Sequence, residues 1–218
     1  AYGFDNDERI ARINLAGDDW VNLYDFPWGS QYKIEGFSER PNIVYVSGAN
    51  KYGLTSLYTL DTSTGKVIDT LFSHSSFDMD YPVISPHTGA IIGAAYTNDF
   101  QHIEYFDKSL AAIQRSIDRA MPDTINTIVS ISTDRALYFV YVQNAKNPGD
   151  YYLYNRSKGT LAYIAPSRTN ITPELSANTR SVTIPMSDGT SIPGYLTIPT
   201  DATSPEKLPT VILPHGGP

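Results

Sequence analysis

One pattern occurs three times along the chain at a constant spacing, and this repeat constrains the fold more than any other feature. Ser38, Ser85 and Ser132 follow one another at intervals of 47 positions (38 to 85, 85 to 132). Each serine ends a short extended run, opens a polar turn and precedes an apolar run, in "GFSERPNIVYVSG", "VISPHTGAIIGAA" and "SISTDRALYFVYV". A fixed period of this length indicates a repeat architecture, in which neighbouring copies stack to bury a continuous core.

Each copy continues with further extended runs. These are "SLYTLD", "HIEYFD" and "YYLYNR", and in two copies the last run is "KVIDTLF" or "TLAYIA". Four short strands per copy predict β-propeller blades, because a lone four-stranded sheet cannot bury both of its faces. The copies lie near 34–72, 77–121 and 123–165, and residues 1 to about 33 resemble the outer part of one more blade. The fold class predicted for 1–165 is mainly β, a partial propeller of about four blades.

The copy near 77–121, which is the third blade when the partial blade at residues 1–33 is counted as the first, contains one stretch that departs from the strand pattern. Between Asp107 and Met121 the apolar residues Leu110, Ile113 and Ile117 are spaced by three and four positions, as on one face of a helix. We therefore predict a surface helix that decorates this blade. The alternative is the strand that the repeat register places at 112–117, "AIQRSI".

The character of the sequence changes after residue 165. The segment 166–180 is typical of a linker with one helical turn, for which Thr172 is the predicted N-cap and Pro173 the first helical residue. Next, two extended runs flank Ser187–Thr190, where Asp-Gly predicts a hairpin turn with both central residues at positive φ. Pro185, Pro193 and Pro199 accompany these runs and suit the edge of a sheet.

A polar loop then leads to "PTVIL", which has the composition of a buried strand, and to His215-Gly216-Gly217-Pro218. The stretch "SDGTSIPGYLTIP…LPTVILPHGGP" resembles the opening of the catalytic domain in the prolyl oligopeptidase family of serine peptidases. The likeness is to the branch of acylaminoacyl peptidases and dipeptidyl peptidases, and "LYTLDTSTGK" and "YPVISPHTG" share it. The resemblance implies a propeller followed by an α/β-hydrolase domain, which 181–218 would begin.

The same resemblance implies roles for two residues of the terminal motif. In α/β-hydrolases the loop after the third strand donates a backbone N–H to the oxyanion hole, and glycine permits the close approach. Gly217 is the implied donor, and His215 is implied to support the loop rather than to act as the triad histidine. The Ser-Asp-His triad of this fold follows the loop, and no Gly-x-Ser-x-Gly occurs in the chain. We therefore expect a catalytically inactive fragment, truncated at both ends.

Composition excludes several other classes of protein. The chain has 16 basic and 23 acidic residues, a formal net charge of −7, which argues against nucleic acid and anionic membranes as partners. It has no cysteine, which excludes thiol catalysis and disulfides within these residues. His74, His87 and His102 are scattered, as surface histidines are, so we predict no metal site and no cofactor. Trp20 and Trp28 are expected to fill blade interfaces.

The interpretation is a fragment of a serine peptidase that hydrolyses short peptides, with the propeller excluding large substrates. Two alternatives stay open: an esterase or other acyl hydrolase on the same scaffold, and a non-catalytic propeller that binds a partner. Short peptides are the expected substrate partner. Open propeller faces would allow homo-oligomers or other association, because they leave apolar surface uncovered. The sequence does not decide between a cytoplasmic and a periplasmic location.

Overall fold

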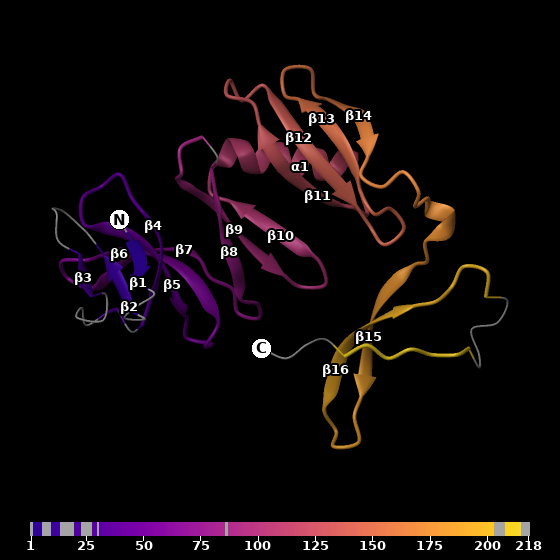
Figure 1. Cartoon of the computed structure of the whole chain (residues 1–218), viewed down its shortest axis with the longest axis horizontal. Coiled ribbons are helices and arrows are strands. Elements are labelled where there is room, and N and C mark those ends of the chain that lie inside the picture. Colours follow the sequence, from indigo (N-terminus) through magenta and orange to yellow (C-terminus); the bar gives the residue numbers. More distant parts are fainter. Residues whose placement is uncertain are drawn as a thin grey trace. The chain divides into compact units, whose positions relative to one another are not determined.

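The computed structural model divides the chain into two compact units, Ala1–Arg119 and Ala120–Pro218. Short antiparallel sheets make up most of both units (Figure 1). The residues that the structure describes are 2–5, 10–13, 20–22, 28–29, 31–85, 87–202 and 208–214.

The described part of the first unit contains three sheets, with strand orders β1-β2-β3, β4-β5-β6-β7 and β10-β9-β8. All neighbouring strands within them are antiparallel and consecutive in sequence, as in a meander. The strands are β1 (Tyr2–Asp5), β2 (Ile10–Ile13), β3 (Val21–Asn22), β4 (Lys33–Phe37), β5 (Ile43–Ala49), β6 (Thr55–Asp61), β7 (Lys66–Phe72), β8 (Met79–Ile84), β9 (Ile91–Thr97) and β10 (Gln101–Tyr105).

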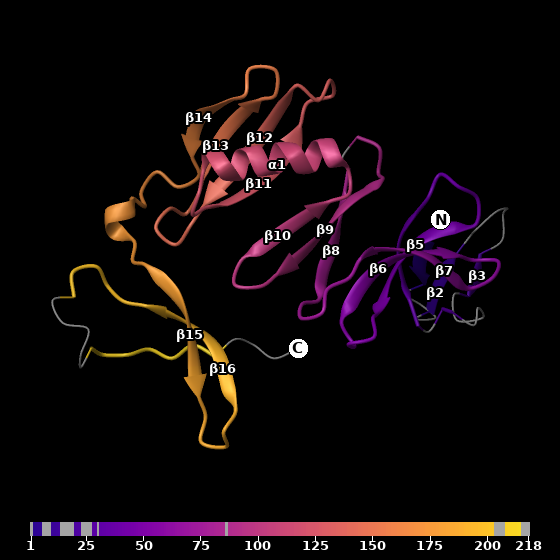
Figure 2. The same cartoon turned by 180° about the vertical axis from the view of Figure 1, so that it is seen from behind.

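Helix α1 (Lys108–Ala120) follows β10 and ends at the boundary between the units (Figure 2). The second unit holds a four-stranded sheet, β11-β12-β13-β14, and a two-stranded sheet, β15-β16. Its elements are β11 (Ile125–Ile131), β12 (Leu137–Gln143), β13 (Asp150–Asn155), β14 (Thr160–Pro166), the 3₁₀ turn η2 (Pro173–Leu175), β15 (Thr179–Pro185) and β16 (Ser191–Thr197).

The three repeated serines occupy equivalent places, which confirms the repeat. Each serine follows the first strand of its sheet. Its backbone N–H donates across the turn to the carbonyl of the residue that begins the second strand or directly precedes it. The N···O distances are 3.1, 2.8 and 2.9 Å, from Ser38 to Ile43, Ser85 to Ala90 and Ser132 to Leu137. Each hydroxyl also accepts a backbone N–H of its own turn or of the strand that follows (Arg40, His87 and Leu137). The serines are turn residues, as their position in the repeat indicates.

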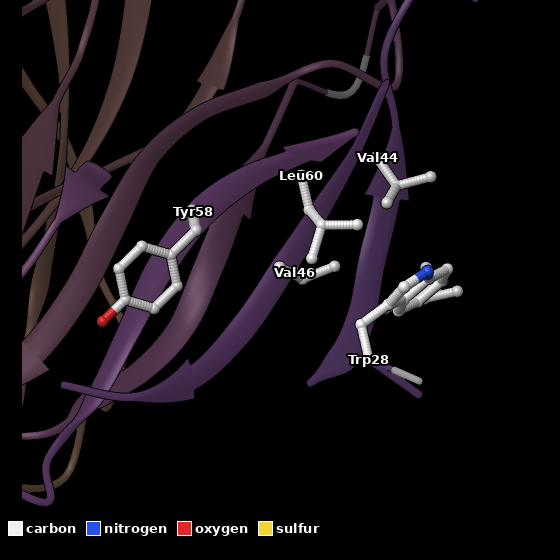
Figure 3. Close-up of a cluster of buried hydrophobic side chains, with 6 residues drawn as sticks. Trp28, Val44, Val46, Tyr58 and Leu60 are labelled. Carbon is white, nitrogen blue, oxygen red and sulfur yellow. The ribbon is translucent and has the colours of Figure 1, made fainter. Parts of the chain in front are cut away.

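Strand β6 is buried on both faces of the sheet β4–β7, and its alternate residues point to opposite sides. Tyr58 and Leu60 lie on one face with Val44 and Val46, to which they are paired across the strands. Trp28 covers this cluster, and only 3% of its surface is exposed (Figure 3). Trp28 is thus a core residue of this sheet. The described cluster draws its strand residues from β4–β7 alone, so for Trp28 the filling of a blade interface stays a prediction. The same prediction is wrong for Trp20, which is 47% exposed.

The other face of this sheet packs against the next sheet. Leu57 of β6 is completely buried in a cluster with Phe72 of β7, Met79 of β8, and Ile91 and Ala94 of β9. The cluster therefore draws side chains from two sheets, and sheet-on-sheet contact of this kind is how neighbouring propeller blades bury their faces. The two sheets β4–β7 and β8–β10 thus pack face to face as adjacent blades would, and their assignment as propeller blades stays a prediction.

The predicted helix in the third blade is present, and the alternative strand at 112–117 is wrong. The carboxylate of Asp107 accepts the N–H groups of Ser109 and Leu110, at 2.8 and 2.9 Å, and so caps the helix at its N-terminus. Leu110, Ile113 and Ile117, the apolar residues that are spaced by three and four positions, are the buried residues of α1. The sheet β8–β10 consequently has three strands, whereas β4–β7 and β11–β14 have four.

The region after residue 165 confirms two predictions and corrects a third. The helical turn η2 forms where the linker was predicted to contain one, with the Leu175 N–H donating to the Thr172 carbonyl at 3.0 Å. The hairpin β15–β16 also forms. The predicted turn geometry is wrong, however, because only Gly189 has positive φ (85°) and Asp188 does not. The Gly189 N–H donates to the Met186 carbonyl, as in a three-residue hairpin loop that ends in a glycine bulge.

The predicted fold class, mainly β with propeller-type sheets, is confirmed by the antiparallel meanders and their face-to-face packing. Among the residues that the structure describes, no helix is long and apolar enough to cross a membrane.

Candidate functional site

Three loops lie at one end of the two packed sheets of the first unit. Strand directions alternate in a meander. The chain therefore leaves the fourth strand at the same end of the sheet as the turn between the second and third strands. These loops are 50–54 after β5, 73–78 between β7 and β8, and 98–100 between β9 and β10. We call this set the loop end.

Side-chain hydrogen bonds tie the loops 50–54 and 73–78 together. Asn50 donates from Nδ2 to the His74 carbonyl at 2.8 Å and to Ser73 Oγ at 3.1 Å. Its Oδ1 accepts the backbone N–H groups of Tyr52 and Leu54 within its own loop. Because one amide bonds both loops, their relative position is set by the Asn50 side chain. The Asp78 carboxylate adds a bond from the Thr55 N–H, at 2.7 Å.

The loop end carries a cluster of five stacked aromatic rings, here named the ring stack: Phe72, His74, Phe77, Tyr96 and His102. Tyr96 is its centre, with ring centroids 5.5 Å from Phe72, 5.7 Å from His74 and 5.1 Å from His102. Phe77 lies 4.7 Å from His74 and 6.2 Å from Tyr96. The planes of all these pairs lie within 30° of one another. Phe72 is buried, and His102 is exposed at the other end.

The hydrogen bonds of the two histidines fix where their protons lie. Nδ1 of His74 accepts the Ser76 N–H at 3.1 Å, so the proton of the neutral ring is on Nε2. Nε2 of His102 lies 3.0 Å from the Asn98 Oδ1. This oxygen also accepts the Phe100 N–H, so the imidazole is the donor. Both rings are therefore held in defined orientations, and His102 is an exposed residue that stacks on Tyr96.

Two other titratable groups of the first unit, Glu35 and Tyr105, lie mostly buried within the protein. Glu35, on β4, has a side chain only 11% exposed, and it accepts from Ser47 Oγ at 2.7 Å and from Lys33 Nζ at 3.0 Å. Tyr105 is buried, and this burial, with Tyr81 and Asp118 nearby, raises the pKa of its hydroxyl to about 12. Neither group is arranged as an acid or base facing a substrate.

The exposed turns hold aspartates whose pKa values are lowered by hydrogen bonds from serine or threonine. Ser63 donates to Asp61 from its hydroxyl and its N–H, and Thr190 does the same for Asp188. For Asp134 the main donor is the Ser132 hydroxyl. These carboxylates stabilise turns. Within the described ranges, no group of three or more histidines and acidic residues could hold a metal ion.

The two site residues implied by the sequence, Gly217 and His215, lie outside the described residues. The run that precedes them is described, and there the prediction of a buried strand is wrong. Val211, Ile212 and Leu213 are not in a strand, and their exposed fractions are 81%, 84% and 86%. An apolar run becomes a buried strand only when other strands flank it, and within the described residues no strand pairs with this one.

The sequence analysis did not find the ring stack. Its members are spread from residue 72 to residue 102, and the register of three strands brings them together. Met79, Tyr96 and His102 are directly opposite one another across β8, β9 and β10. Three members lie on strands and two lie in the loop 73–78, and the spacing of these aromatic residues carries no periodicity that the sequence could have signalled. His87, the third scattered histidine, lies in the turn after Ser85 and outside the stack.

Comparison with known proteins extends this description. No family model matches the chain. Dipeptidyl aminopeptidase BIII of Pseudoxanthomonas mexicana is 24% identical over 209 residues, which are 91% of this chain and 30% of that protein. A solved structure from a study of two prolyl endopeptidases, concerned with inter-domain dynamics in catalysis and specificity, matches with a TM-score of 0.54. It has 12% identity and covers 88% of this chain and 28% of that one.

The fold and the comparisons agree on a class of protein. The antiparallel sheets match those of the prolyl endopeptidase, and at this level of identity that likeness concerns the fold. The chain is related to peptidases of the prolyl oligopeptidase family, and it spans less than a third of the length of the two proteins compared.

Proposed function

We propose that this chain is part of a serine peptidase that hydrolyses short peptides. The observation that carries the proposal is the similarity to a dipeptidyl aminopeptidase, which extends over 91% of the chain. The supporting order of elements is propeller-type sheets first, then the hairpin β15–β16, then His-Gly-Gly-Pro.

The catalytic triad would lie outside this chain, and the terminal motif would contribute to the oxyanion hole. Gly217 would aim its backbone N–H at the negative oxygen of the tetrahedral intermediate, with no side chain in the way. His215 would hold the loop in place. The second N–H would come from the residue after the nucleophilic serine. The propeller would limit access to the active site and so exclude folded proteins.

The test uses the complete protein that contains these residues, with peptide p-nitroanilides as substrates. Gly217→Pro removes the backbone N–H, and we expect kcat to fall about 100- to 1000-fold with little change in KM. Gly216→Ala is the matched control, because it keeps every N–H of the loop. Equal kcat values for the two variants, each shown to be folded, would exclude Gly217 as a donor.

Substrate size and bond type test the rest of the proposal. We expect cleavage of peptides of a few residues and no cleavage of the same sequence within a folded protein. Hydrolysis of acyl esters without any amide cleavage would instead identify an esterase. Absence of both activities in a folded complete protein would leave a propeller that only binds.

A further inference from the structure

The sheet β8–β10 ends in an edge strand at the place where two other sheets of the chain have a fourth strand. The chain turns into helix α1 directly after β10, so the fourth position is not filled by the blade's own sequence. Within the described ranges, no strand pairs with the outer edge of β10 (Figure 1). We call this feature the β10 edge. An edge of this kind can accept an added strand.

The backbone pattern identifies the groups that the β10 edge presents. Phe106 N–H donates to Ile92 O at 2.8 Å, and antiparallel hydrogen bonds alternate along a strand. His102 and Glu104 therefore exchange their backbone bonds with β9. The N–H and C=O groups of Gln101 and Ile103 point away from it, toward a strand added on the outside.

The side chains at this edge select the added strand. His102 is the last ring of the ring stack, and the row Met79–Tyr96–His102 crosses the sheet on one face. An added residue opposite His102 would continue this row, so an aromatic side chain there would stack on the exposed imidazole. The bond between His102 Nε2 and Asn98 already holds the ring in place.

Glu104 lies on the same face as His102, two residues further along, and is exposed. A strand added antiparallel to β10 with an aromatic residue opposite His102 places the residue two positions earlier opposite Glu104. A lysine or arginine at that position would face the carboxylate. The residue between them would exchange both of its backbone hydrogen bonds with Ile103.

We infer that the β10 edge binds an extended peptide segment with the pattern basic-x-aromatic, added as a fourth, antiparallel strand of the sheet. The inference does not depend on the proposed peptidase activity, since no catalytic residue takes part in it. The backbone groups of Gln101 and Ile103 would supply affinity, and the side chains of His102 and Glu104 would supply selectivity.

The test measures binding of fluorescein-labelled Thr-Lys-Val-Tyr-Thr to the 218-residue chain by fluorescence anisotropy. The matched control is the same peptide with N-methylvaline at its centre, which keeps all side chains and loses the N–H that would donate to Ile103. We expect the control to bind at least about fivefold more weakly. Gln101→Pro, which removes an outward N–H without disturbing the bonds to β9, should also weaken binding.

Three variants separate a specific site from general stickiness. His102→Ala should weaken binding about 3- to 10-fold, and His102→Phe, which keeps a ring, should restore it. Glu104→Lys should reverse the charge preference, so that Thr-Glu-Val-Tyr-Thr binds about 2- to 5-fold better than the lysine peptide. Far-ultraviolet circular dichroism and Trp28 fluorescence check that each variant is folded.

Several results would overturn the inference. One is equal affinity for the parent and the N-methyl peptide, and another is equal weakening by His102→Ala and His102→Phe. A third is a dimer of the chain in sedimentation velocity that Gln101→Pro dissociates, because a second copy would then occupy the β10 edge. Absence of binding at millimolar peptide to the folded chain would overturn it as well.

Discussion

The packing of Leu57 between two sheets gives the sharpest test of the fold. Leu57 is completely buried in the cluster that joins β4–β7 to β8–β10. Replacing a buried leucine by alanine costs about 2–5 kcal/mol, since the burial of the lost methyl groups disappears and a cavity remains. We expect Leu57→Ala to lower the free energy of unfolding by about 3 kcal/mol. For a domain of this size that is a fall in Tm of roughly 6–12 °C.

The assay is urea unfolding followed by tryptophan fluorescence and by circular dichroism at 218 nm. Trp28 is a suitable probe because it is buried on the opposite face of the same sheet. Ile68→Ala, on β7, is the matched control. That side chain is 50% exposed, so its loss should cost less than about 1 kcal/mol.

A double-mutant cycle then tests whether the two sheets pack on each other. Leu57 belongs to β6 and Met79 to β8, and both belong to the shared cluster. If they pack together, the double variant Leu57→Ala/Met79→Ala should differ from the sum of the single variants by about 0.5–2 kcal/mol. Strict additivity, or a Leu57→Ala effect no larger than that of Ile68→Ala, would refute the packing of the two sheets as adjacent blades.

Three further predictions concern single residues. Gly93→Ala should lower the free energy of unfolding by more than about 2 kcal/mol, because the added Cβ would lie 2.6 Å from the backbone oxygen of Glu104. Gly53→Ala is the control: its Cβ would meet nothing within 4 Å, so it should cost only the roughly 1–2 kcal/mol that a non-glycine residue loses at positive φ. The folded state keeps the proton of Tyr105 up to about pH 12, whereas an unfolded tyrosine releases it near pH 10. Raising the pH through this window should therefore lower stability by up to about 1.4 kcal/mol per unit, and Tyr105→Phe should remove this part of the slope measured in urea titrations. Asn50→Ala should cost about 2 kcal/mol and speed amide hydrogen exchange at Leu54, whose N–H loses its acceptor; unchanged exchange there would contradict the role given to Asn50.

The repeat made much of the fold predictable, for a physical reason. Ser38, Ser85 and Ser132 each close a turn by the same backbone bond, and a local device of this kind is visible in the sequence. Helix α1 was equally predictable, because its apolar spacing and the cap at Asp107 are local features. The Asp-Gly turn was predicted with the wrong geometry. A glycine bulge suits the same dipeptide, and the hydrogen bonds of the turn, not its composition, decide between them.

What the sequence could not supply depends on distant contacts. The ring stack exists because strand register aligns Tyr96 with His102, and no short motif encodes that alignment. The run Val211–Leu213 has the composition of a buried strand, yet burial requires flanking strands, and the described residues provide none. Trp20 shows the same limit, because its exposure depends on its surroundings and not on its residue type.

The measurement that tests the proposed peptidase most directly is labelling of the complete protein with a fluorophosphonate, followed by mass spectrometry of tryptic peptides. The account predicts stoichiometric modification of one serine that lies after Pro218 in the sequence, at the centre of a Gly-x-Ser-x-Gly motif. Modification of a serine within residues 1–218, or a folded complete protein that takes no label, would contradict it.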